Sequence, residues 1–91
     1  MQLITDHARQ AIITKYIGPT DLRGSRVKAT AEAGSITLAW DDALNSEENH
    51  VAAARALAGK YGWDRLNDMT HGGTRDGYVF VMVPKAIEVA A

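Results

Sequence analysis

Residues 26–40, RVKATAEAGSITLAW, hold the clearest structural signal in the chain, two runs in which apolar and polar side chains alternate. Alternation with a period of two is typical of a strand with one buried face, so residues 26–31 and 35–40 are expected to be strands. The residues between the runs end in Gly34, which can adopt the positive φ that a short loop requires. The stretch therefore predicts a β-hairpin with its apolar side chains on one side.

A further strand is predicted before this hairpin. Residues 11–17, AIITKYI, are rich in β-branched and aromatic side chains, and the run stops at the turn signal of Gly18 and Pro19. Residues 1–10 lack such a pattern and are expected to be a flexible N-terminal segment.

The segment after the hairpin has the period of a helix. Asn45 stands where an N-cap residue is expected, and Glu48 follows three residues later, as in a capping box. Apolar residues, many of them alanine, recur at helical spacing as far as Tyr61, and Gly62 then stands where a left-handed C-cap residue is expected. The pattern predicts one amphipathic helix of about four turns, packed closely on a sheet by its small residues.

Two more strands are predicted after the helix, at residues 66–71 and 78–83. The second run is continuously apolar and ends at Pro84, which predicts a central strand buried on both faces. The element order predicts an α+β fold with an antiparallel sheet of four to five strands and one helix on one face, in a single domain over residues 11–84. Residues 85–91 are expected to form a C-terminal tail.

Composition excludes several classes of function. The 91-residue chain has no cysteine, which rules out disulfides, thiolate metal sites and cysteine nucleophiles. No apolar run is long enough for a membrane span and no export signal is visible, so we expect a cytoplasmic protein that makes no membrane contact. The net charge is −1, but basic residues prevail in 1–31 and acidic residues in the remainder, which favours a specific partner over a generic polyanion.

Two glycine-rich loops hold the candidate binding residues. The first, GPTDLRGSRVK at residues 18–28, concentrates three cations beside two hydroxyls, and the second, HGGTRDG at residues 71–77, adds one arginine. Arginine forks and hydroxyls match phosphate or carboxylate oxygens, so we expect an anionic ligand or an acidic partner surface. The predicted binding residues are Thr20, Arg23, Ser25, Arg26, Lys28 and Arg75. Both segments also have a purely structural interpretation, as a tight surface loop and as a hairpin turn at Asp76 and Gly77.

The remaining polar clusters are explained by structure. The acids near the helix start, Asp41, Asp42, Glu47 and Glu48, stand beside His50 and could ligate a divalent metal, but they fall where a helix N-terminus prefers negative charge and lack EF-hand spacing. The histidines are scattered and no nucleophile motif is present, so no catalytic residue, metal or cofactor is assigned. The tyrosines and tryptophans fit core packing better than base stacking.

Three segments carry a resemblance to a known group of proteins: TKYIGPTDLRGSRVKA, WDDALNSEENHVAAARALAGKYGW and GGTRDGYVFV. Over roughly residues 11–83 the chain resembles a family of small uncharacterised proteins carried by bacteriophages and mobile plasmids. The resemblance implies an accessory gene of a mobile element, expressed in bacterial cytoplasm, and transfers no catalytic or binding residue. Short accessory proteins of that kind are often binders that block a host defence complex, such as anti-CRISPR proteins.

Three functions remain open at this point. The leading expectation is a non-enzymatic binding protein of a phage or mobile element that inhibits a host defence system by binding a host protein complex. The alternative is a nucleic-acid or nucleotide-phosphate binding module that uses the same loops, with affinity that falls steeply as salt rises. The third is a small homo-oligomeric structural subunit, assembled through the apolar strand and the alanine-rich helix face.

Overall fold

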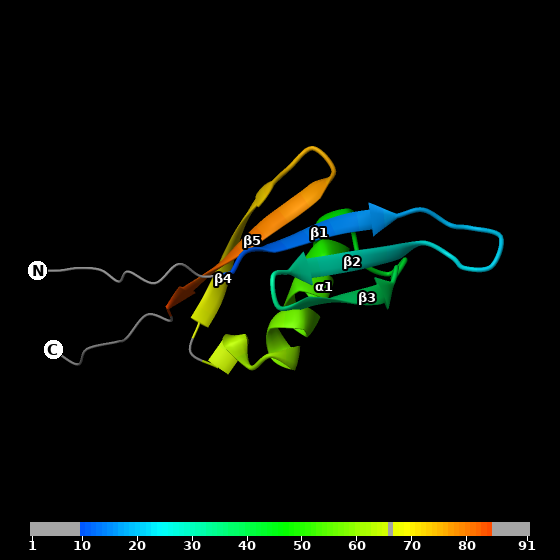
Figure 1. Ribbon diagram of the computed structural model, residues 1–91. Helices are drawn as coiled ribbons and strands as arrows, with labels where there is room; N and C mark the ends of the chain where they lie inside the picture. The colour runs from blue at the N-terminus through cyan, green and yellow to red at the C-terminus, as the bar shows by residue number, and fades with distance from the viewer. Residues whose placement is uncertain (1–9, 66, 85–91) are drawn as a thin grey trace, which may run out of the picture.

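The computed structural model describes residues 10–65 and 67–84. They form a five-stranded antiparallel sheet with one helix packed against it, which confirms the predicted α+β class (Figure 1). The strands lie in the order β3-β2-β1-β5-β4. Their bounds are β1 Ile12–Ile17, β2 Arg26–Ala31, β3 Gly34–Ala39, β4 Asn67–Gly73 and β5 Gly77–Pro84. The predicted flexible segment at residues 1–10, apart from Gln10, and the predicted tail at 85–91 lie outside the described residues.

The predicted hairpin is present as β2 and β3, in unbroken register from Arg26 opposite Ala39 to Ala31 opposite Gly34. The prediction of a positive φ at Gly34 is wrong, because the φ of this residue is not positive. A glycine leaves room there for the Tyr61 hydroxyl oxygen, which would have to shift if residue 34 carried a Cβ atom. That hydroxyl donates a hydrogen bond of 3.1 Å to the Ala33 carbonyl, and thereby ties the end of the helix to the hairpin turn.

Helix α1 (Ser46–Lys60) has both predicted ends. The Asn45 side chain accepts a hydrogen bond of 2.8 Å from the Glu48 backbone, and the Glu48 carboxylate accepts one of 2.9 Å from the Asn45 backbone, which completes the capping box. Gly62 has a φ of 71°, as expected for a left-handed C-cap. Small, fully buried side chains allow close approach to the sheet; they are Ala53, Ala54 and Ala58.

Helix α1 covers only one face of the sheet, where it packs on β1, β2 and β3 (Figure 1). Strand β5 shows the consequence. It is an interior strand, between β1 and β4, and its Phe80 and Met82 are buried on the helix side, but Val81 and Val83 are 39% and 37% exposed on the other side. The prediction that residues 78–83 are buried on both faces is therefore wrong, because a single helix cannot cover both.

Candidate binding surface

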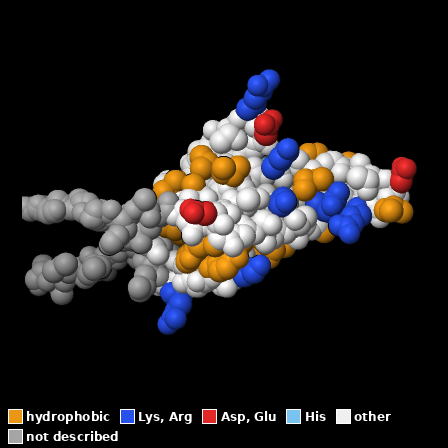
Figure 2. Space-filling model, in the orientation of Figure 1, with side chains coloured by type: hydrophobic (Ala, Val, Ile, Leu, Met, Phe, Trp, Pro, Cys, Tyr) orange, Lys and Arg blue, Asp and Glu red, His pale blue; other side chains and the backbone are white. Residues whose placement is uncertain are grey.

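The predicted cations of the first loop lie at one end of the sheet. Arg26 and Lys28 are on β2 and face away from α1, because Val27 between them is buried under the helix. Arg23 is exposed in the loop that joins β1 to β2. Figure 2 views the sheet from the side opposite α1 and shows Lys and Arg side chains gathered towards this end.

Lys15 belongs to the same surface, although sequence reasoning did not select it. The register places Lys15 directly opposite Lys28, and Ile17 opposite Arg26. Directly opposite side chains have Cβ atoms about 5 Å apart and diagonal neighbours are about 7–8 Å apart, so these cations are crowded. We call Lys15, Arg26 and Lys28 the cationic cluster. The sequence signal for Lys15 is its place within the predicted strand, on the same face as Ile13 and Ile17, but its pairing with Lys28 emerges only from the register.

No carboxylate of the described residues lies within ion-pair distance of the cationic cluster, and the one contact of that kind among them joins His71 and Glu47 on the helix side. Arg26 donates an Nε–H hydrogen bond of 3.3 Å to the Gly24 carbonyl, which holds its guanidinium beside the loop. Like charges directly opposite in a sheet are destabilising. The arrangement therefore costs folding free energy.

The two predicted hydroxyls shape the loop. Thr20 Oγ1 accepts hydrogen bonds from the backbone N–H groups of Leu22 and Arg23, at 3.4 and 3.1 Å. The Ser25 and Tyr16 hydroxyls are joined by a hydrogen bond of 2.8 Å. Their first role is therefore to hold the turn that presents Arg23.

A wide hollow of about 600 Å³ opens beside this loop. It is lined by residues 23–26, by residues 37–40 and by Asp42, so it contains Arg23, Ser25 and Arg26 of the predicted set. Arg75 is not among its lining residues.

Arg75 lies in the turn between β4 and β5, which is closed by a hydrogen bond of 2.7 Å from the Thr74 N–H to the Gly77 carbonyl. Because Gly77 pairs with Lys15, this turn and the β1–β2 loop leave the sheet at the same end. Figure 1 shows that they project in different directions. The structure thus groups Arg26 and Lys28 with Lys15 and places Arg75 on a separate projection.

An apolar patch adjoins the cationic cluster on the open face. Ile13 is 55% exposed, and it lies two residues before Lys15 on β1 and opposite Val79 of β5. Val81 and Val83 continue the same face along β5. We call Ile13, Val79, Val81 and Val83 the apolar patch; Figure 2 shows hydrophobic side chains exposed on this face.

A buried polar contact joins α1 to the sheet beneath this surface. Thr14 Oγ1 donates a hydrogen bond of 3.3 Å to the Tyr78 carbonyl and lies 2.7 Å from His50 Nδ1. Thr14 and His50 share a hydrogen bond, and the tautomer of the imidazole decides which of the two donates. Burial lowers the pKa of His50 from its ordinary value of 6.5.

We predict that His50 makes the protein less stable in mild acid. Its neutral form is favoured in the folded state, so the unfolded chain takes up a proton first as the pH falls through about 6.5. The contribution of His50 to the free energy of unfolding should be constant above about pH 7, and the free energy of unfolding should fall below about pH 6.5. Denaturant unfolding across this range should show the fall in the natural protein and a flatter profile in His50→Gln. Equal slopes in the two proteins would contradict the prediction.

The acidic residues near the start of α1 have structural roles. Glu48 completes the capping box, and Asp41 Oδ1 accepts a hydrogen bond of 2.9 Å from the Ala43 N–H. The buried Asn49 side chain accepts from the Asp41 N–H at 2.8 Å and so fixes this loop. No group of three metal-ligating side chains occurs among the residues described. In the same part of the chain, no helix is sufficiently long and apolar to cross a membrane.

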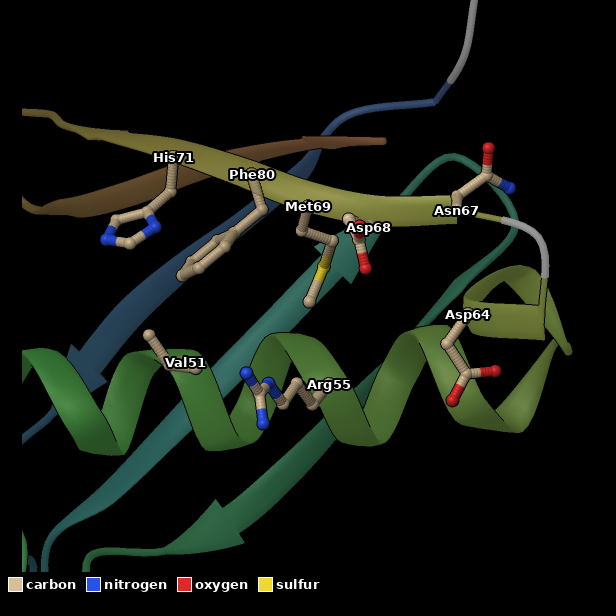
Figure 3. Close-up of a pocket in the computed structure, with 8 residues that line it drawn as sticks. All are labelled: Val51, Arg55, Asp64, Asn67, Asp68, Met69, His71 and Phe80. Carbon is tan, nitrogen blue, oxygen red and sulfur yellow. The ribbon is translucent and has the colours of Figure 1, made fainter. Parts of the chain in front are cut away.

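A second hollow, of about 550 Å³, lies between α1 and β4 (Figure 3). Its apolar lining comes from Val51 of α1, Met69 of β4 and Phe80 of β5. The His71 ring stacks on the Phe80 ring with 4.9 Å between the ring centroids. His71 also donates an Nε2–H hydrogen bond of 2.7 Å to the Glu47 carboxylate. The other polar lining residues are Arg55, Asp64, Asn67 and Asp68. Sequence reasoning did not predict this hollow, because it depends on where α1 crosses the sheet.

Comparisons of the chain with protein-family models, with curated proteins and with solved structures returned no match.

Proposed function

We propose that this protein is a non-catalytic binding protein that docks the open face of its sheet on the acidic surface of a partner protein. The observation that carries the proposal is the pairing of Lys15 with Lys28, with Arg26 diagonal to Lys15 and none of the three in an ion pair with a described residue. A chain that places like charges opposite each other loses stability, and a carboxylate-bearing partner would restore it.

The apolar patch favours a protein over a nucleic acid as the partner. Protein interfaces combine an apolar centre with polar and charged surroundings, and Ile13 and Val81 are exposed beside the cationic cluster. Single-strand nucleic-acid binders instead place aromatic rings on the binding face. Here the aromatic side chains of the described strands, Tyr16, Tyr78 and Phe80, alternate onto the helix side.

The class of partner follows from the resemblance noted for the sequence. An accessory protein of a mobile element that binds a host defence complex would inhibit it by occupying an acidic surface of that complex. This part of the proposal rests on the resemblance alone, whereas the acidic docking surface rests on the geometry.

Affinity purification of the tagged protein from a bacterial lysate tests the proposal. Nuclease-treated and untreated halves are compared by mass spectrometry, for the natural protein and for a variant that combines Arg23→Ala with Arg26→Ala. We expect a partner that survives nuclease with the natural protein and is lost with the variant.

The matched control combines Arg55→Ala with Arg65→Ala, which removes two arginines away from the open face and should leave capture intact. A partner retained equally by all three proteins would refute the docking surface. Recovery of nucleic acid, with proteins lost after nuclease, would instead support the phosphate-binding alternative.

A further inference from the structure

Strand β4 has a free outer edge, since no described strand lies beyond it in the sheet. Thr74 and Gly77 form a hydrogen-bonded pair at the turn, and counting back from this pair shows which residues of β4 direct their backbone groups at the outer edge. In an antiparallel ladder the hydrogen-bonding direction alternates, so Asp68, Thr70 and Gly72 point their backbone groups at β5. The backbone groups that point outwards belong to Asn67, Met69, His71 and Gly73.

Two features by which natural edge strands avoid pairing with another chain, a lysine or proline within the strand and a β-bulge, do not occur in β4, whose one charged side chain is Asp68. The sequence of β4, NDMTHGG, contains neither lysine nor proline. Its register with β5 runs unbroken from Asn67 opposite Pro84 to Gly73 opposite Tyr78, without a bulge. An edge in regular register, without lysine, proline or a bulge, can serve as a template for one more strand.

The two edges of the sheet differ in what lies beside them. Helix α1 packs against β3, whereas the hollow lined by Val51, Met69 and Phe80 separates it from β4. A strand added to β4 would therefore bury apolar side chains as well as form backbone hydrogen bonds.

We propose that a second copy of this chain pairs with the β4 edge in antiparallel fashion, around a two-fold axis at Thr70. In this register Thr70 faces the partner's Thr70, Met69 faces the partner's His71, and Asn67 faces the partner's Gly73. All four outward-pointing residues then form hydrogen-bonded pairs. An axis at Met69 would leave Gly73 unpaired, and an axis at His71 would leave Asn67 unpaired.

The side chains on both faces are compatible with this register. Asp68, which lines the hollow, lies opposite the partner's Gly72, so no like charges meet, and a Thr70 pair on the open face is a favourable cross-strand contact. On the helix side Met69 lies beside the partner's His71 at the mouth of the hollow. An axis through one residue keeps both helices on the same side, so the two cationic clusters share one face of a continuous sheet.

Charge substitutions at Thr70 test the proposal by sedimentation equilibrium over a range of concentrations. The apparent molecular mass of the natural protein should rise with concentration from that of one protomer to that of two. Thr70→Lys and Thr70→Glu place like charges opposite each other on an exposed surface, so each alone should lose the dimer. An equal mixture of the two variants should regain it, because opposite charges then meet across the axis.

Thr37→Glu, the same change on the other edge strand, should leave the dimer intact, and circular dichroism should show that all variants remain folded. A single-protomer mass at every concentration, dimers in either charged variant alone, a mixture that stays monomeric, or loss of the dimer in Thr37→Glu would each overturn the proposal. Partner capture through the cationic cluster does not depend on this result, because the two surfaces share no residue.

Discussion

Gly77→Ala should destabilise the protein by about 3 kcal/mol or more, or prevent folding, because a side chain there has no space. A Cβ atom at this position would collide with the backbone carbonyl of Thr14 and lie 3.2 Å from the His50 ring. Gly77 pairs with Lys15 at the start of β5, so it cannot move away without breaking the ladder between β1 and β5. The expected result is a large fall in the midpoint of denaturant unfolding.

Gly73→Ala is the matched control, because Gly73 lies in the same hairpin and a Cβ atom there would meet nothing within 4 Å. Its φ is not positive, so an alanine can adopt its backbone conformation. We expect a change within about 1 kcal/mol for Gly73→Ala. Similar losses for the two variants would show that the close approach of β5 to Thr14 does not limit stability.

Local elements of this fold could be predicted because their signals lie within a few residues of each other. The hairpin at 26–40 is specified by two alternating runs and a short turn, and α1 is specified by Asn45 with Glu48 at one end and Gly62 at the other. Two errors came from judging a residue by its neighbours in sequence. Gly34 makes room for Tyr61, far along the chain, and residues 78–83 are apolar on both sides although only one side is covered.

The candidate surface could be predicted only in part, because its key relation is between strands. Arg26 and Lys28 were predicted from their own loop and strand, but Lys15 became part of the site through its register with Lys28. The free edge of β4 and the hollow beside it likewise depend on strand order and on the path of α1. Sequence periodicity shows which face a residue occupies, and does not show which strand lies next to it.

Lys15→Glu should change stability and partner binding in opposite directions. Opposite Lys28, a glutamate replaces repulsion by attraction, so we expect the free energy of unfolding to rise by about 0.2–1 kcal/mol. The same change puts a negative charge on the face that we propose for an acidic partner, so affinity should fall on the order of tenfold or more, about 1.4 kcal/mol. Denaturant unfolding and the recovery of the captured partner measure the two effects.

The double variant that combines Lys15→Glu with Lys28→Glu separates the two causes. It restores like charges across the ladder, so its stability should return towards that of the natural protein, while partner binding should be weaker still. Lys60→Glu, at the end of α1, changes the net charge by the same amount as Lys15→Glu and should leave partner binding unchanged. A loss of stability in Lys15→Glu would contradict the repulsion inferred from the register. If Lys15→Glu is more stable and captures the partner undiminished, the register is confirmed. The cationic cluster is then not the docking site, because reversing the charge of one of its members does not weaken partner binding.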